Sequence, residues 1–71
     1  MKFIKINKSW YVRGDLIRDI WLSGEDKSRV NIAYVVAGMT PDHMDCSNGN
    51  EARQIFDDVI RQLNSPTVLD D

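Results

Sequence analysis

Residues 52–63 read ARQIFDDVIRQL, and this stretch decides the fold of the 71-residue chain. Its apolar residues are separated by three, one, three, one and three positions. A helix of about 3.6 residues per turn gathers such residues into one apolar stripe and leaves the polar residues on the opposite side. The spacing therefore predicts an amphipathic helix that turns one face toward a core. The stripe consists of Ala52, Ile55, Phe56, Val59, Ile60 and Leu63.

Both ends of this helix are marked in the sequence. The run 47–51 offers several capping residues, among them Asn48 with Glu51 three residues on, and the run 64–66, Asn-Ser-Pro, stops a helix. Asp57 and Arg61 form an acid-to-base pair four residues apart, in the order that stabilises a helix. We therefore expect the helix to lie between these two runs.

Upstream of the helix, alternation of side chains indicates strands. Residues 3–6 alternate, and residues 10–13 follow after the turn residues 7–9, which favours a hairpin. Residues 30–37 suit a central strand, because β-branched and aromatic residues alternate with smaller ones. One face of this strand would carry Val30, Ile32, Tyr34 and Val36, and the other Asn31, Ala33, Val35 and Ala37.

The segment 16–22 breaks the alternation. Ile17 and Ile20 are three positions apart, so they cannot share one face of a regular strand. We expect a helical turn opened by Asp15, or a bulge, to shift the parity before the chain continues as a strand through residues 21–22.

Two turns and a short strand complete the pattern. Residues 23–28 form a turn that joins the third strand to the central strand as a hairpin, and residues 38–42 form another. Residues 43–46 then favour a short last strand, with Pro41 just ahead of it, where a missing N–H is tolerated.

These elements predict an α+β fold, an antiparallel meander of four to five short strands with one C-terminal amphipathic helix packed on one face. We expect a single small domain over residues 1–64 and a flexible acidic tail over residues 65–71. A sheet covered on one side leaves its other face to water or to a partner. The expected core consists of Ile4, Ile6, Ile20, Ile32, Tyr34, Ile55, Phe56, Val59, Ile60 and Leu63.

The composition is that of a small globular protein. Hydrophobic residues make up 42% and charged residues 28% of the chain, so neither a disordered nor a fibrous class is indicated. The single cysteine, Cys46, cannot form an intramolecular disulfide, and residues 1–8 lack the unbroken apolar stretch of a signal peptide. No stretch approaches the roughly 18 apolar residues of a membrane span. We expect a cytoplasmic protein that has no cofactor and does not bind a membrane.

Residues 10–20, WYVRGDLIRDI, resemble the second-strand region of the small flagellar FlbD-like proteins, in which a short strand meets an Asp-Leu-Ile turn and then another Ile. The order of strands and the closing amphipathic helix are also similar over about residues 3–63. The resemblance implies a cytoplasmic accessory protein, and it brings no catalytic motif to this chain.

The segment 42–46 holds the only His and the only Cys beside two carboxylates. In an extended strand His43 and Asp45 share one face while Cys46 and Met44 point to the other, which separates the two best metal ligands. We therefore expect no metal site, a buried Cys46 and Met44, and a surface His43.

Catalysis is not indicated either. Asp57 and Asp58 are adjacent on the helix and point in different directions, so they do not converge on a substrate. The four glycines sit in separate turns and form no phosphate loop. A chain this short also leaves little room for a pocket of about 300 Å³. We expect a protein that is not an enzyme.

The charge is distributed unevenly. Residues 1–30 contain seven Lys or Arg and four Asp or Glu, giving +3, whereas residues 31–71 contain two and seven, giving −5. Cations among aromatic residues are typical of sheet-based single-strand binders, and nucleic-acid binding is therefore one alternative, although the acidic balance of the whole chain argues against it. The cations are Lys2, Lys5, Lys8 and Arg13, and the aromatic residues are Phe3, Trp10 and Tyr11.

The acidic second half suggests another alternative. Its carboxylates could mimic a phosphate backbone, as in an inhibitor of a nucleic-acid-binding machine encoded by a mobile element. These carboxylates belong to Asp42, Asp45, Glu51, Asp57 and Asp58.

The main expectation is a protein-binding module, an adaptor or inhibitor that docks on a larger protein through a sheet face, a strand edge or its acidic helix side. Two tryptophans cannot both be central in so small a core, so one should be partly exposed. The half-apolar second sheet face also favours a symmetric homodimer. The expected protein-binding residues are Trp10, Tyr11, Ala33, Val35, Asp57 and Asp58.

Overall fold

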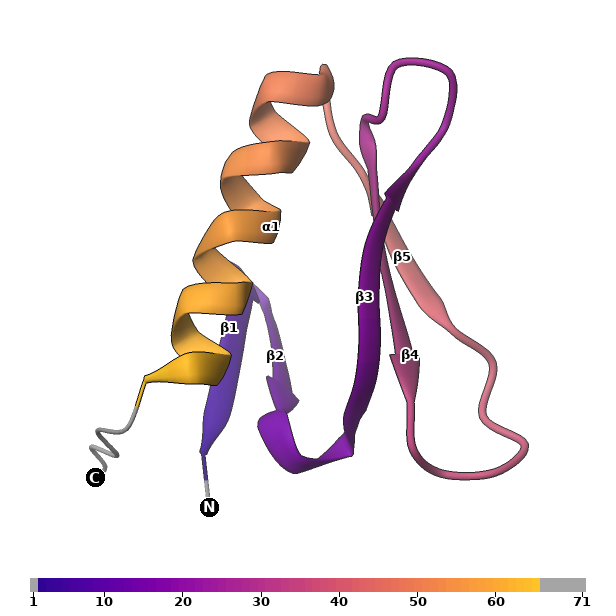
Figure 1. Cartoon of the computed structure of the whole chain (residues 1–71), viewed down its shortest axis with the longest axis vertical. Helices are drawn as coiled ribbons and strands as arrows, with labels where there is room; N and C mark the ends of the chain where they lie inside the picture. Colours follow the sequence, from indigo (N-terminus) through magenta and orange to yellow (C-terminus); the bar gives the residue numbers. More distant parts are fainter. Residues whose placement is uncertain (1, 66–71) are drawn as a thin grey trace.

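The computed structural model describes residues 2–65, which form five strands and one α-helix (Figure 1). All the strand pairs within these residues are antiparallel, and the helix packs on the strands, which confirms the predicted α+β class. The elements in chain order are β1 (Phe3–Asn7), β2 (Trp10–Arg13), a 3₁₀ turn (Gly14–Leu16), β3 (Ile17–Ser23), β4 (Arg29–Tyr34), β5 (Asp42–Asp45) and α1 (Gly49–Asn64).

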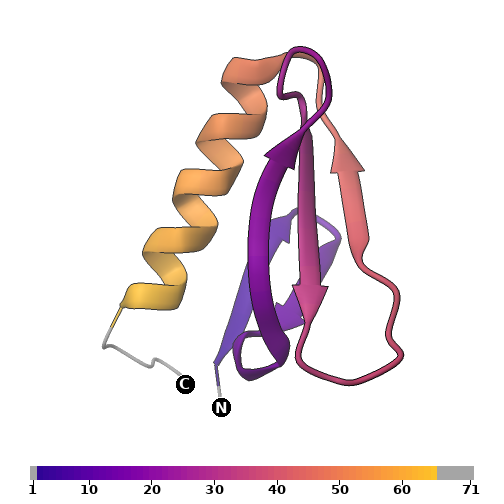
Figure 2. The same ribbon diagram turned by 45° about the vertical axis from the view of Figure 1, so that its right-hand side comes forward.

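The strands form two sheets rather than one continuous meander. β1 pairs with β2, and the second sheet has the order β3-β4-β5. The 3₁₀ turn redirects the chain between β2 and β3, so these two strands do not pair and the first hairpin lies behind the second sheet (Figure 2). In both views α1 lies on the side of β3, and β5 lies on the far side of β4.

The segment that leads into β3 shows the predicted change of parity. The register of β3 against β4 shifts between Ile17 and Asp19, and the 3₁₀ turn comes directly before this shift. A helical turn and an irregularity in the ladder therefore both occur. After the shift, Ile20 pairs with Ile32 of the central strand.

The central strand β4 is shorter than expected, because it ends at Tyr34 instead of residue 37. The chain turns at Gly38, whose φ is 86°, so Val36 leaves the expected core face and is exposed. Ala33, expected on the open second face, is buried, with 2% of its surface exposed. The methyl group of Ala33 extends less far from the sheet than the longer side chains of the neighbouring strands, which therefore cover it.

The core lies where the first hairpin, β4 and α1 meet. Ile4 of β1, Val12 of β2 and Val59 of α1 pack around Ile32 and Tyr34 of β4. A domain this small covers the middle of the helical stripe but not its flanks. The residues expected in the core that are only half-buried are Ile20, Ile55, Phe56, Ile60 and Leu63. The buried residues that are missing from the expected core are Val12, Val30, Ala33 and Ala52.

The predicted ends of α1 are confirmed. Asn48 Oδ1 accepts a hydrogen bond from the Glu51 backbone N–H at 2.9 Å, and Glu51 Oε1 accepts one from the Ser47 N–H at 2.7 Å. The helix ends at Asn64, and Ser65 is extended. Residues 66–71 of the expected tail lie outside the described residues. Within residues 2–65, no helix is both long and apolar enough to span a bilayer.

Candidate functional site

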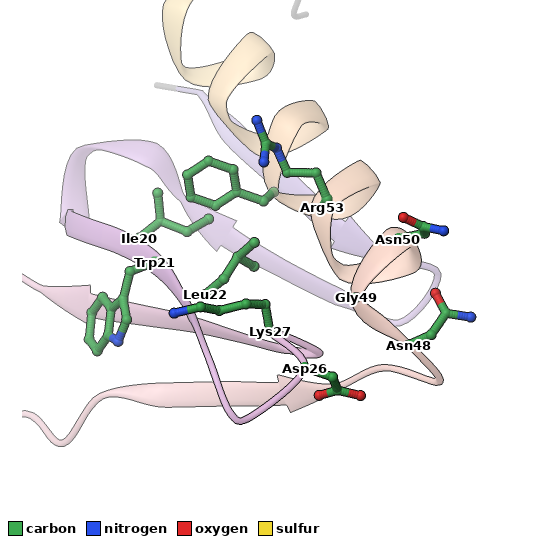
Figure 3. Close-up of a pocket in the computed structure, with 10 residues that line it drawn as sticks. Ile20, Trp21, Leu22, Asp26, Lys27, Asn48, Gly49, Asn50 and Arg53 are labelled. Atoms are coloured by element: carbon green, nitrogen blue, oxygen red, sulfur yellow. The ribbon is translucent and has the colours of Figure 1, made fainter.

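A groove with a volume of about 740 Å³ runs between β3 and the first half of α1 (Figure 3). Ligand pockets have volumes of roughly 300–1,000 Å³, so the groove is large enough to hold a ligand. The expectation that so short a chain has little room for a pocket is therefore wrong.

The first wall of the groove is the edge of β3. Ile20, Trp21 and Leu22 all line it, and since successive side chains of a strand point to opposite faces, a groove lined by three consecutive residues follows the strand edge. In Figure 3, Ile20 and Leu22 point toward α1 and Trp21 points the other way. Ile20 and Leu22 are half-buried, and 41% of Trp21 is exposed.

In the part of the chain that the structure describes, no strand pairs with β3 along this edge. β3 is the outer strand of its sheet. Apart from the ladder with β4, the backbone of residues 18–23 makes a single further hydrogen bond within the described residues, in which the Trp21 carbonyl accepts from Asn31 Nδ2 at 3.2 Å. The N–H and C=O groups that point away from β4 are therefore open to another strand.

The second wall of the groove is one stripe of α1. Asn50, Arg53 and Phe56 recur every three residues, which places them on one flank of the helix. Phe56 is half-buried at the border of the apolar stripe, so it contributes apolar surface to the groove rather than to the centre of the core. Arg53 is exposed and donates from Nε to Asp57 Oδ1 at 3.2 Å.

One end of the groove is closed where the β3–β4 turn meets the start of α1. A side chain at Gly49 would collide with the backbone carbonyl oxygen of Asp26, so only glycine allows this approach. Lys27 has a positive φ of 59°. Hydrogen bonding by the Ser28 side chain lowers the pKa of Asp26, and the Ser28 backbone N–H, which donates to Asp26 Oδ1 at 3.2 Å, lowers it further. The Lys27 amine has no hydrogen bond or ion pair within residues 2–65.

The residues expected to bind protein are spread over several elements. Tyr11 on β2 and Val35 after β4 are exposed, by 55% and 54%. Trp10 is half-buried and packs against the core, so Trp21 is the partly exposed tryptophan that the composition predicts. Ala33 is buried and offers no surface to a partner.

The two acidic candidates on α1 are both ion-paired within the helix. Asp57 pairs with Arg53, and Asp58 pairs with Arg61. The predicted pair of Asp57 with Arg61 is not among the ion pairs of the described residues. One arginine lies before the two carboxylates and one lies after them at helical spacing, and each carboxylate forms an ion pair with a different arginine. Little negative charge is therefore left uncompensated at these positions.

Three of the four cations of the nucleic-acid alternative lie on the first hairpin, and the fourth has another role. Lys5 and Arg13 are exposed on the hairpin formed by β1 and β2, and Lys8 is exposed in its turn. Lys2 instead donates from Nζ to the carbonyl oxygens of Gln62 and Ser65, both at 2.8 Å, at the C-terminus of α1. Lys2 therefore serves the helix end rather than an outside ligand.

The segment with the single thiol shows no reactive arrangement. Burial raises the pKa of the Cys46 thiol, and the charges of Glu51 and Asp45 raise it further, so the thiol stays protonated and weakly nucleophilic at neutral pH. His43 is exposed on β5, and Met44 and Cys46 are half-buried. Within residues 2–65, no three His, Cys, Asp or Glu side chains are placed to hold a metal ion together.

Comparison with known proteins gives no relative from which a function could be transferred, because no family model, curated protein or solved structure matches the chain. The resemblance to the FlbD-like proteins therefore stays a prediction.

Sequence reasoning did not find the groove. The one signal it offers is the uncharged run 20–22 on a strand that also contains Arg18 and Asp19. Whether that run lies at a sheet edge depends on the order of strands, and the position of Phe56 beside it depends on the angle at which α1 crosses the sheet.

Proposed function

We propose that this chain is a small protein-binding module, an adaptor or inhibitor, that holds an extended segment of a larger partner protein in the groove between β3 and α1. The observation that carries the proposal is the bare edge of β3 beside Phe56 of α1. A partner segment that paired with this edge would become a fourth strand of the β3-β4-β5 sheet, and strand addition of this kind is a recurring mode of peptide recognition.

Among the strand edges of residues 2–65, the edge of β3 is the best suited to such pairing. β3 has seven residues, whereas β2 and β5 have four each, and short or charged edges resist pairing. β5 also carries two aspartates and a histidine. The charges of β3, Arg18 and Asp19, lie in its first half and pair with each other at 3.2 Å. The half that lines the groove, residues 20–22, is uncharged.

The side chains around this edge favour apolar residues in the partner segment. An extended segment along β3 places alternate side chains on two sides. On one side they would meet Ile20 and Leu22, and on the other side Trp21. Phe56 of α1 adds apolar surface to the lining of the groove. Covering the remaining apolar surface stabilises a complex by about 25 cal/mol for each Å² removed from water. Apolar side chains therefore fit at both sets of alternate positions.

A cation without a partner among the described residues lines the groove and favours an acidic residue in the partner segment. Lys27 comes from the β3–β4 turn, and in Figure 3 its side chain extends along the groove toward Trp21 and Leu22. Its amine has no partner among the described residues, while Arg53 is already paired with Asp57. A carboxylate on the partner segment would pair with Lys27. We therefore propose an extended, apolar segment with an acidic residue at the position that meets Lys27.

The acidic side of α1 supports a docking role less well. Asp57 and Asp58 each have an intrahelical arginine, and a phosphate-mimicking surface needs carboxylates whose charge is not already compensated. The groove instead offers unpaired backbone groups and apolar side chains at one place.

The proposal can be tested with a library of short random peptides selected for binding to the chain. We expect the selected peptides to be apolar with one acidic residue. Arg53→Trp fills the groove from an exposed helix position and should weaken binding of the selected peptides by about tenfold or more. Gln54→Trp is the matched control, because it places the same side chain on the next, exposed residue outside the groove.

Equal binding by the Arg53→Trp and Gln54→Trp variants would contradict the proposal. A weight-average mass that rises with concentration for the wild type but not for Arg53→Trp would also contradict it, because the groove would then be occupied by a second copy of the chain.

A further inference from the structure

A second surface of the molecule, the outer face of the first hairpin, carries exposed aromatic rings next to cations. We define this outer face by Phe3, Lys5, Tyr11 and Arg13. Phe3 lies directly opposite Arg13, and Lys5 lies directly opposite Tyr11. Each ring therefore has a cation as its cross-strand neighbour.

The alternation of the two strands produces this face. Ile4, Ile6 and Val12 point into the core, so the residues between them point outward. Phe3 is 57% exposed and Tyr11 is 55% exposed. Lysines that protect a strand from aggregation would account for Lys5, but they do not account for two large rings left in water on the same face.

We propose that the outer face binds single-stranded nucleic acid, with bases stacked on Phe3 and Tyr11 and phosphates paired with cations of the hairpin. Cross-strand diagonal neighbours are about 7–8 Å apart, so two rings at such positions can each take a base. Phosphates would reach Lys5, Arg13 and Lys8, the last of which is exposed in the turn. Stacking tolerates any base, so we expect little sequence preference.

Asp15 moderates this surface. Arg13 donates from Nε to Asp15 Oδ1 at 3.1 Å and from Nη2 to Asp15 Oδ2 at 2.7 Å. A phosphate that approaches Arg13 has to compete with this carboxylate. Removing the charge of Asp15 should therefore increase the affinity for nucleic acid. This increase is not expected if the nucleic acid is held by positive charge elsewhere on the molecule.

The experiment is fluorescence anisotropy of labelled oligouridylate and oligothymidylate at low salt, which also compares RNA with DNA. Three phosphate contacts predict that the logarithm of the binding constant falls with the logarithm of salt with a slope of about −2. Phe3→Ala and Tyr11→Ala should each weaken binding about fivefold or more, and Asp15→Asn should strengthen it.

Controls separate this surface from the groove and from general effects. Val35→Ala removes an equally exposed apolar side chain elsewhere, and Arg61→Gln removes an exposed cation on α1. Both variants, and the groove-filling Arg53→Trp variant, should bind the oligonucleotides like the wild type. The inference therefore stands or fails independently of the proposed docking function.

Three results would overturn the inference. These are no binding of either oligonucleotide at low salt, unchanged binding by folded Phe3→Ala and Tyr11→Ala variants, and binding of duplex DNA as tight as that of the single strands. The last result would mean that charge alone holds the nucleic acid.

Discussion

The side-chain amide of Gln62 on α1 hydrogen-bonds both backbone groups of Lys5 on β1. Gln62 Nε2 donates to the Lys5 carbonyl oxygen at 2.9 Å, and Gln62 Oε1 accepts from the Lys5 N–H at 2.9 Å. These two bonds satisfy the edge of β1 as a neighbouring strand would. Within residues 2–65, a helix side chain thus covers the free edge of β1 at Lys5, whereas the longer edge of β3 has no such cover.

Replacing Gln62 by Ala should destabilise the fold by about 2 kcal/mol, because two hydrogen bonds are lost and the Lys5 backbone groups keep no partner but water. Gln54→Ala removes the same side chain from an exposed position on the same helix and should change the free energy of unfolding by less than about 0.5 kcal/mol. Urea unfolding of both variants measures the difference. Equal free energies of unfolding for the two variants would mean that the hydrogen bonds between Gln62 and the Lys5 backbone do not stabilise the fold.

The amine of Lys2 joins the two ends of the described chain. It donates to the carbonyl oxygens of Gln62 and Ser65 at the end of α1, where the helix dipole also favours a cation. Lys2→Met keeps most of the aliphatic side chain and removes the charge, and we expect a loss of about 1 kcal/mol in chemical unfolding. Lys8→Met, on an exposed turn residue, is the control, and a similar loss there would refute the role assigned to Lys2.

Gly49 allows the β3–β4 turn to approach the start of α1. Gly49→Ala should cost about 1–3 kcal/mol in thermal or chemical unfolding, because the new methyl group collides with the Asp26 carbonyl. Helix propensity alone predicts the opposite sign, since Ala is favoured over Gly in a helix by about 1 kcal/mol. Asn50→Ala, at the next and exposed position, should be nearly neutral. A stabilised Gly49→Ala variant would show that the turn and the helix do not touch.

Tyr34 makes the stability depend on pH in the alkaline range. Burial, together with the hydrogen bond that its hydroxyl donates to Asp42 Oδ2 at 2.6 Å, raises the pKa of Tyr34 from 10 to about 12. Folding favours the protonated form, so this contribution is complete below pH 10 and is lost as the pH rises toward 12.

Comparison with Tyr34→Phe isolates this effect from the titration of other groups. The stability of the wild type relative to the variant should decrease between pH 10 and pH 12 in urea unfolding. A difference that stays constant or increases over that range would contradict the assignment.

The local features of the fold could be predicted because short-range chemistry determines them. The Asn48 cap, the apolar stripe of α1 and the change of parity between Ile17 and Ile20 each depend on residues within four positions of one another. Where two ion pairs at the same spacing are possible, the sequence alone does not predict which one forms. Asp57 has an arginine four residues away on each side, and it pairs with Arg53.

The features that were not predicted depend on contacts between distant residues. The sequence presents Lys2 as a cation that is available to a ligand. In the fold, its amine is bound by the end of α1, 60 residues later in the chain. Phe56 belongs to the apolar stripe by its spacing, but the angle of α1 places it in the groove. The division into two sheets likewise follows from the direction that the 3₁₀ turn gives the chain, which its three residues do not reveal.

The central claim, that β3 receives a fourth strand, is tested most directly by hydrogen exchange at the backbone amides of residues 18–23. The amides that point away from β4 have no acceptor among residues 2–65. On saturation with a peptide selected for binding, we predict that these amides exchange about tenfold or more slowly, while the amides of β5 are unchanged. Unchanged exchange along β3, with protection on β5 or on the outer face of the first hairpin instead, would contradict the claim.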